Sequence, residues 1–271
     1  MRRTIFIAGA GAAAAGLVAL APRWRGETWT QWLTKAAWSW AGVPSGPLGW
    51  VSTHWVMPVL HAPIYPLMAK ELELQPDDEL LEVACGSGIF LAEQATNVRQ
   101  VVGLDLSDLQ LSLARQRLAG RIAAGTAEII EGDAVALPWE DGRFSVVTCM
   151  GSVEAFPEPE RALAEMYRVL RPGGRAVVCL GGNVAEGTET HQVLGAVWVW
   201  NEADARRVTE EAGFIDVAVS YEPARGESSL SRVVDRFVKM EEIRFVRGLK
   251  PPPAAGEPAS PTPSLVTTGA S

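Results

Sequence analysis

The chain has 271 residues, of which 48% are apolar and 21% charged, and its formal net charge is −8. These values are those of a soluble globular protein and exclude a disordered chain, a fibrous repeat and a polytopic membrane protein. The charge is unevenly placed: residues 1–61 carry five Lys and Arg and one Glu, whereas the remainder carries nineteen and thirty-one. Seven of the ten tryptophans also lie within residues 1–61. We therefore expect the basic, Trp-rich head and the acidic body to meet different surroundings.

The composition of the body excludes several kinds of partner. An acidic chain is not expected to bind nucleic acid, because phosphate binding needs a basic footprint. Cys85, Cys149 and Cys179 are too few and too isolated for a disulfide framework or a zinc site, and they fit a reducing compartment. The three histidines have no metal-ligand spacing. No metal site is predicted.

The first charge-free stretch, residues 4–21, is flanked by arginines on both sides. Eighteen uncharged residues just reach the length that spans a bilayer. The stretch fits a cleaved signal peptide or an uncleaved anchor that spans or lies on a membrane, and the two arginine flanks give no orientation. Gly9-Ala10-Gly11 resembles the start of a dinucleotide fingerprint, but no second strand with an acidic end follows about twenty residues later.

Residues 28–41 carry four tryptophans, at positions 29, 32, 38 and 40. Tryptophan favours the headgroup region of a bilayer, and anionic lipid attracts basic segments. Residues 1–42 are therefore predicted to be a hydrophobic, Trp-rich segment that associates with a membrane and places the protein at its cytoplasmic face. The alternatives are a helix packed on the body, a cytoplasmic protein, or an exported one if the head is cleaved.

From residue 63 onward, apolar strands alternate with helices. The expected helices are 89–96, 108–120, 159–170 and 202–213, and the expected strands are 79–84, 100–106, 127–134, 144–150, 175–180, 214–221 and 241–249. This order predicts an α/β fold with a doubly wound, mostly parallel sheet covered by helices on both faces. Ligands of such sheets bind beyond the carboxyl ends of the strands. The Pro-rich residues 250–271 are predicted to be a disordered tail.

Acidic residues and glycines stand at three of these strand ends. Glu82 precedes a glycine loop that opens a helix, a place where the backbone can approach a ligand closely. Asp105 ends the second strand, where a carboxylate can accept hydrogen bonds from ribose hydroxyls. Asp133 follows the third strand and can accept from an exocyclic amine. The pattern predicts a nucleoside-containing ligand.

Five segments in this order resemble the class I S-adenosylmethionine-dependent methyltransferases, specifically the methyltransferase type 11 group. They are LLEVACGSGIF, VVGLDLS, EGDAVALPWEDGRFSVVTCM, MYRVLRPGGRAVV and EEAGFIDVAV, and the resemblance covers residues 76 to about 220. It implies a Rossmann-like, seven-stranded sheet with a reversed last strand. It also implies S-adenosyl-L-methionine as cofactor, a methyltransferase activity, and a catalytic domain over residues 76–249.

The resemblance also implies roles for individual residues. Glu82 and the loop Ala84, Cys85, Gly86, Ser87 and Gly88 would hold the methionine moiety; Asp105 the ribose; Leu106, Asp133 and Ala134 the adenine; and Cys149 and Met150 would close the pocket. The sequence departs from the family pattern twice. Ala84 stands where the first loop glycine is usual, which a small residue should tolerate. Ser145 stands where a structural carboxylate often follows the phenylalanine.

The acceptor is less well defined. The chain lacks the Asn/Asp-Pro-Pro-aromatic signature of amino-group methylases of DNA and the Pro-Cys pair of cytosine methylation. His61, Tyr65 and Glu154 are the polar candidates near the pocket, and none is assigned as a catalytic base. Residues 43–75 are predicted to be a helical lid, and their apolar, aromatic character suggests a small hydrophobic or lipid-like acceptor. The alternative is a membrane-tethered protein that binds the cofactor without turnover. The sequence gives no oligomeric state.

Overall fold

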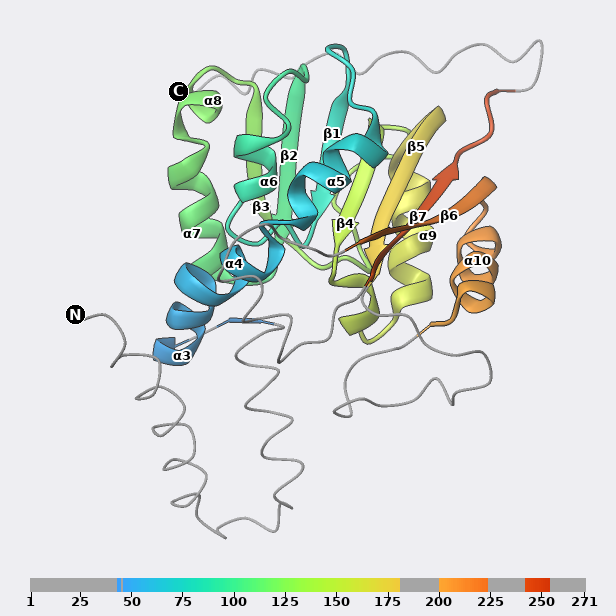
Figure 1. Cartoon of the computed structure of the whole chain (residues 1–271). Coiled ribbons are helices and arrows are strands. Elements are labelled where there is room, and N and C mark those ends of the chain that lie inside the picture. The colour runs from blue at the N-terminus through green and yellow to red at the C-terminus, as the bar shows by residue number, and fades with distance from the viewer. Residues whose placement is uncertain (1–42, 45, 181–199, 224–241, 254–271) are drawn as a thin grey trace, which may run out of the picture. The chain divides into compact units, whose positions relative to one another are not determined.

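The computed structural model describes residues 43–44, 46–180, 200–223 and 242–253 (Figure 1). The strands are β1 (Glu79–Val83), β2 (Gln100–Asp105), β3 (Ala127–Glu131), β4 (Phe144–Met150), β5 (Leu170–Leu180), β6 (Ile215–Pro223) and β7 (Glu242–Leu249). The helices are α3 (Gly46–Val51), α4 (Met57–His61), α5 (Ile64–Leu72), α6 (Ile89–Glu93), α7 (Asp108–Arg117), α8 (Ala119–Ala123), α9 (Pro159–Val169) and α10 (Glu202–Glu211). One π-helical turn, Ser52–Val56, joins α3 to α4.

The described strands form one seven-stranded sheet in the order β3-β2-β1-β4-β5-β7-β6. Strands β1 to β5 pair in parallel, whereas β7 runs antiparallel to both of its neighbours. The expected doubly wound sheet with a reversed last strand is therefore confirmed. Strand order reverses at β1, whose carboxyl end lies between those of β2 and β4. This is the position where such sheets bind ligands.

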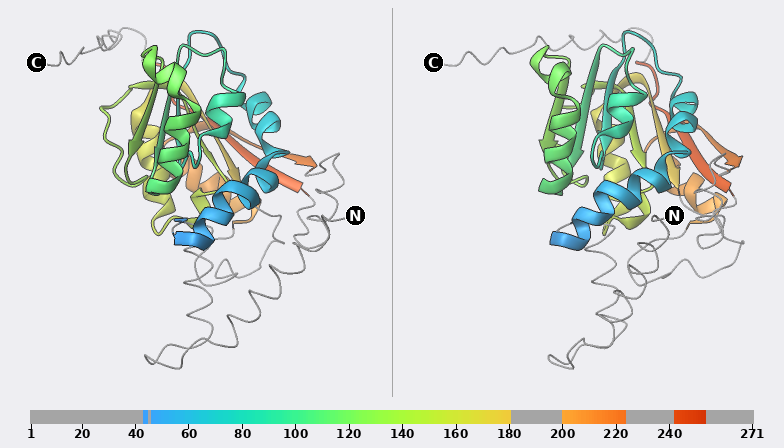
Figure 2. Two further views of the ribbon diagram at one scale, coloured as in Figure 1. Left: turned by 90° about the vertical axis from the view of Figure 1, so that its left-hand side faces the viewer. Right: turned by 60° about the vertical axis from the view of Figure 1, so that its left-hand side comes forward.

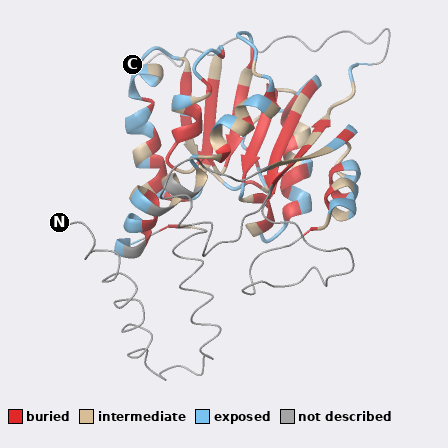
Figure 3. Cartoon of the chain, viewed as in Figure 1, coloured by how far each residue is buried: buried red, intermediate tan, exposed pale blue. Residues whose placement is uncertain are grey.

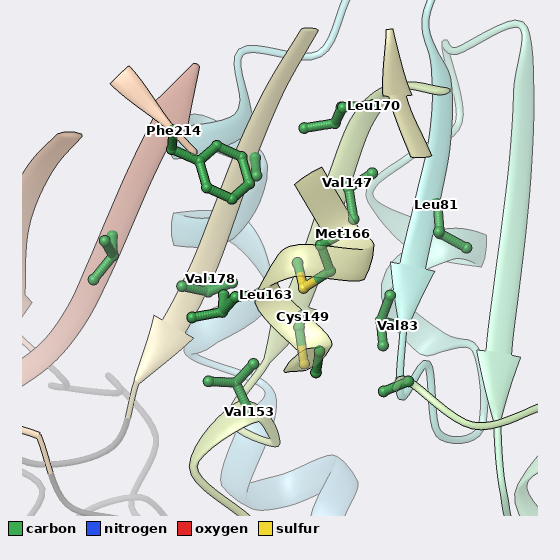
Figure 4. Close-up of a cluster of buried hydrophobic side chains, with 14 of the residues drawn as sticks. Leu81, Val83, Val147, Cys149, Val153, Leu163, Met166, Leu170, Val178 and Phe214 are labelled. Atoms are coloured by element: carbon green, nitrogen blue, oxygen red, sulfur yellow. The ribbon is translucent and has the colours of Figure 1, made fainter. Parts of the chain in front are cut away.

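Helices cover both faces of the sheet (Figures 1 and 2). Helices α5, α6 and α7 bury side chains against one face, and α9 and α10 bury theirs against the other. Helix α9 illustrates why a helix packs on the sheet. Its apolar residues Leu163, Met166 and Val169 recur at helical spacing, so they share one face, and that face is fully buried. In Figure 4, Leu163 and Met166 meet Cys149 and Val178 of the sheet. The sheet interior is almost continuously buried (Figure 3), as expected when both faces are covered.

The largest differences from the predicted elements are in β5 and in the helix predicted over residues 108–120. Strand β5 begins at Leu170 rather than residue 175, because Leu170 pairs with Phe144 across a β-bulge that takes up the intervening Pro-Gly-Gly. The helix predicted over 108–120 is two helices, α7 and α8, which meet at Leu118. Lys250, placed at the start of the predicted tail, is instead fixed to the body, since its N–H donates to the Gly174 carbonyl at 2.9 Å.

The Ser145 departure is compensated by a residue from another element. The Ser145 hydroxyl donates to Asp78 Oδ1 at 2.7 Å and accepts from the Glu79 N–H at 2.9 Å. Asp78 also binds Arg175 of β5, with Nη2 2.5 Å from Oδ2. Burial alone would raise the pKa of Asp78, but the bonds from Arg175, the Gln75 N–H and Ser145 hold it below its usual value. A structural carboxylate is thus present at the amino ends of β1 and β4.

The predicted lid is helical over most of its described length. On α5, the side chains of Ile64, Met68 and Leu72 are buried in the hydrophobic core on one face of the sheet. Ahead of α3, the Pro44 carbonyl accepts a bond of 2.8 Å from the hydroxyl of Ser107, which caps α7. The lid is therefore fastened to the body at both ends.

The predicted membrane segment, residues 1–42, lies outside the described residues, as do residues 254–271 of the predicted tail. Among the helices that the structure describes, none has the length and apolar character needed to cross a bilayer.

Candidate active site

A cavity of about 340 Å³ lies beyond the carboxyl ends of β1 to β4, beneath the lid helices α4 and α5. Its volume is in the range of small-molecule sites. Ten of the predicted site residues line it, namely Glu82, Ala84, Cys85, Gly86, Ser87, Asp105, Leu106, Asp133, Ala134 and Met150. The exceptions are Gly88 and Cys149. Residues from four strands and the lid are thus brought to one place, as the strand-end pattern predicted.

The glycine loop between β1 and α6 owes its shape to three residues with positive φ: Ala84 at 56°, Gly86 at 53° and Gly88 at 70°. Ala84 therefore adopts a conformation that favours glycine, at a cost of about 1–2 kcal/mol. Gly88 does not line the cavity because it packs inward: a Cβ there would lie 3.0 Å from the Cβ of Ala114 on α7. Gly88 is needed for this close packing and for its positive φ.

Asp105 holds the same loop from the end of β2. Its Oδ2 accepts from the Gly86 N–H at 2.8 Å, and its Oδ1 accepts from the Ser107 N–H at 2.9 Å. Burial raises the pKa of Asp105, while these backbone bonds oppose the rise. Each carboxylate oxygen can accept two hydrogen bonds. Asp105 therefore retains capacity for a ligand that carries hydroxyl groups.

The side chain of Glu82 is the strongest indication that the cavity binds a ligand with a cationic group. Its side chain is buried at the cavity wall, and among the described residues its Oε2 has no hydrogen-bond partner. Burial, and then the nearby Asp105, raise the pKa of Glu82 well above its usual value. An unpartnered buried carboxylate is costly unless a ligand satisfies it. The amino group of a bound amino acid would do so, which fits the predicted methionine moiety.

The adenine end of the cavity combines polar and apolar groups. Asp133 Oδ1 accepts from the Val135 N–H at 3.1 Å, which orients the carboxylate. Leu106 is a cavity residue and is 51% exposed, so it offers an apolar surface that a flat base could cover. Gln110 of α7 also lines the cavity, with a buried Oε1 that has no partner among the described residues. No local pattern marks Gln110 as a site residue beyond its position three residues after the Ser107 cap.

The opposite half of the cavity is formed by the lid and the loop after β4. It is lined mainly by apolar side chains, together with His61 and Tyr65. Two expectations for this half are wrong. Cys149 belongs to the buried core and does not line the cavity. Glu154, expected near the pocket, does not line the cavity: it is buried, and its Oε1 lies 3.6 Å from the Arg244 guanidinium of β7.

The sequence that forms this site matches a known family. The family model described as a methyltransferase domain matches residues 81–178, which run from β1 into β5. Residues 81–178 are a methyltransferase domain. The resemblance inferred from the sequence is thereby confirmed, and S-adenosyl-L-methionine is the methyl donor of that family.

Curated relatives of this domain are named as methyltransferases of quinones. One is the demethylmenaquinone methyltransferase of Lactiplantibacillus plantarum, 34% identical over 48% of this chain and 54% of its own. Another is the chloroplastic 2-phytyl-1,4-beta-naphthoquinone methyltransferase of Arabidopsis thaliana, 41% identical over 37% of this chain and 41% of its own. The chain thus spans about half the length, or less, of these curated relatives.

A solved structure shares the fold of the domain at greater distance. The 4+2 cyclase SpnF superposes with a TM-score of 0.56 over 70% of this chain and 80% of its own, at 20% identity. Its name is not that of a methyltransferase. The fold is therefore shared more widely than the reaction, and function has to be argued from the site.

Proposed function

We propose that the protein transfers a methyl group from S-adenosyl-L-methionine to a small, apolar acceptor. One observation carries the proposal: Glu82, Asp105 and Asp133 line the same cavity as the apolar lid residues. The acids fit the amino, ribose and adenine groups of the cofactor. The lid half of the cavity, which is lined mainly by apolar side chains, would take the acceptor.

The domain's own residues position the reactants. When bound, S-adenosylmethionine supplies an electrophilic methyl group, so the protein has mainly to orient the reactants and exclude water. Glu82 and the glycine loop would hold the amino-acid end, and Asp105 the ribose. Met150 and Phe156 line the cavity after β4 and keep that wall apolar. Met57 and Pro58 of α4 do the same from the lid.

For the acceptor class, we propose a reduced naphthoquinone or a similar phenolic ring that carries an apolar tail. The names of the relatives support this choice, and so does the apolar lining of the lid half. The reduced form is specified because a quinol ring is nucleophilic, whereas a quinone ring is electrophilic. A polar amine acceptor would find no charged partner among the lid residues that line the cavity.

We also propose that residues 1–42 bring the protein to the cytoplasmic face of a membrane. The support comes from the sequence: a charge-free stretch at 4–21, flanking arginines and clustered tryptophans. An acceptor with a long apolar tail resides in a bilayer, which is consistent with such a location. Deletion of residues 1–42 should lower activity on vesicle-embedded acceptor while sparing a short-tailed soluble one. Equal activity on both after deletion would contradict the proposal.

The proposed activity is tested with isotopically labelled S-adenosylmethionine and three acceptors: a prenylated naphthoquinol, its oxidised quinone and histamine. We expect label in the naphthoquinol alone, with one S-adenosylhomocysteine formed per methyl transferred. Tight cofactor binding without transfer to any acceptor would favour the alternative, a cofactor-binding protein without turnover. Label in histamine but not in the naphthoquinol would contradict the acceptor class.

A further inference from the structure

The lid half of the cavity contains few groups that could handle a proton. Of the described lining residues contributed by the lid and the loop after β4, the polar side chains are those of His61, Tyr65 and Ser152. Ser152 donates its hydroxyl to the Met150 carbonyl at 3.3 Å. Glu154, on the same loop, does not line the cavity and pairs with Arg244. His61 and Tyr65 are left facing the acceptor space.

His61 is placed against the end of β4. It is the last residue of α4, and its Nε2 lies 3.9 Å from the position that a Cβ on Gly151 would take. Gly151 directly follows β4 and has a φ of 64°. The imidazole therefore lies next to the strand end, on the side where a side chain at residue 151 would begin. The Tyr65 ring packs edge-on against it, with the centroids 6.3 Å apart.

The side chains of His61 and Tyr65 differ in their ability to accept a proton. Burial lowers the pKa of His61, so the ring is neutral at pH 7 and one nitrogen can accept a proton. Burial, and then the nearby Glu82, raise the pKa of Tyr65, so its hydroxyl stays protonated and can only donate or accept a hydrogen bond as a neutral group. Other titratable groups line the cavity from the strands and the glycine loop: Glu82, Cys85, Asp105 and Asp133.

We propose that His61 is the general base of the transfer and takes the hydroxyl proton of a phenolic acceptor bound in the lid half. This inference rests on the proposed function and adds a catalytic residue to it. His61 lies in a cavity with apolar walls, where an acceptor hydroxyl has few other polar partners. A positioned base of this kind contributes about 10²- to 10⁴-fold to the rate.

With a quinol as acceptor, the transfer moves two protons around the formation of one carbon–carbon bond. The acceptor O–H bond breaks, the proton goes to the imidazole, and the electron pair makes the conjugated ring carbon nucleophilic. That carbon forms the new bond to the methyl carbon while the C–S electron pair stays with sulfur. His61 then returns its proton to the acceptor oxygen as the ring C–H proton leaves to water. The net change is methylation of the ring and release of one proton to solvent.

The first test uses binding rather than turnover. The probe is 2-naphthol, titrated by its fluorescence in the presence of S-adenosylhomocysteine, with wild type and the variants His61→Asn and His54→Asn. His54 is the matched control, because it lies in the same helical stretch but bonds the Trp50 carbonyl and does not line the cavity. We expect His61→Asn to bind 2-naphthol about tenfold more weakly at pH 7.5. Because the pKa of His61 is lowered, wild-type affinity should fall only in acid, below the ordinary histidine pKa of about 6.5, and the variant should lack this dependence.

The second test varies the acidity of the acceptor. With an ordinary naphthol or quinol acceptor, His61→Asn should lower kcat about 10²-fold or more and leave S-adenosylmethionine affinity unchanged. With a phenolic acceptor already ionised at the assay pH, the loss should shrink to a few-fold, because no base is then needed. A residue that only shapes the lid would lower both rates equally.

The outcomes separate this inference from the proposed function. A wild-type protein that binds S-adenosylmethionine but methylates no phenolic acceptor overturns both the activity and the base. A wild-type protein that transfers, with His61→Asn equal to it in rate and pH profile, overturns the role of His61 alone. An equal loss on acidic and ordinary acceptors would likewise overturn it.

Discussion

The Asp105 carboxylate and the Gly86 N–H, 2.8 Å apart, join the end of β2 to the glycine loop after β1. The bond gives Asp105 two functions in the site. It fixes the loop against which the cofactor's amino-acid end would lie, and it presents oxygens to the ribose. Shape and recognition in this site therefore depend on one side chain, and a substitution that spares size but not charge should affect both.

Asp105→Asn should weaken S-adenosylhomocysteine binding about 100-fold or more, because an amide nitrogen facing Gly86 would oppose a donor with a donor. Isothermal titration calorimetry measures this directly. Glu131→Gln is the matched control, since Glu131 pairs with Asp105 in the sheet register but is exposed. Equal affinities for Asp105→Asn and wild type would mean that the cofactor lies elsewhere.

Ala84→Gly should stabilise the protein by about 0.5–1 kcal/mol, because glycine adopts the observed φ of 56° without strain. Urea unfolding monitored by circular dichroism gives the free energy. Ala92→Gly, in helix α6, should have the opposite sign and cost about 1 kcal/mol. A destabilised Ala84→Gly variant would show that the loop does not hold this conformation in solution.

Arg175→Met should destabilise the protein by about 3 kcal/mol at pH 7, because it leaves the buried Asp78 carboxylate without its cation. The pKa of Asp78 is lowered in the folded state, so the stability it contributes is present above the unfolded pKa of about 4 and is lost as the pH falls below it. The deficit of the variant should therefore shrink in acid. Arg207→Met, which breaks an exposed pair with Glu211, should change stability by less than about 0.5 kcal/mol.

Glu82→Gln should stabilise the cofactor-free protein while abolishing cofactor binding. The pKa of Glu82 is raised in the folded state, so wild-type stability falls as the pH rises from the unfolded pKa through the folded one. The variant should lack this fall and be the more stable protein at pH 8. Glu93→Gln, on the exposed face of α6, should alter neither stability nor binding. If Glu82→Gln bound the cofactor normally, the buried carboxylate would have another purpose.

Much of the fold could be predicted because its signals are local. Apolar runs marked the strands, and the acids at 82, 105 and 133 followed from their places at strand ends. The carboxyl ends of parallel strands lie at one edge of a sheet, so these three acids are expected to lie close together there. The loop accommodates Ala84 in place of glycine, as expected. Its positive φ is a strained backbone conformation that the amino-acid sequence alone does not reveal.

The features that sequence reasoning missed depend on contacts between distant elements. Asp78 replaces the carboxylate missing at Ser145 although the two residues are 67 positions apart. Glu154 follows β4 in the sequence and was expected near the pocket, but it is buried and pairs with Arg244 of the distant strand β7. Gln110 lines the cavity because α7 turns that face toward the glycine loop. None of these relations leaves a periodic or local pattern.

The most direct test of whether this cavity holds a methyl donor is a crystal structure of the full chain with S-adenosylhomocysteine. We expect its amino group at Glu82, its ribose at Asp105, its adenine between Leu106 and Asp133, and its sulfur facing the half of the cavity that contains His61. S-adenosylhomocysteine bound at another place, or absent from this cavity at saturating concentration, would contradict the assignment of the site.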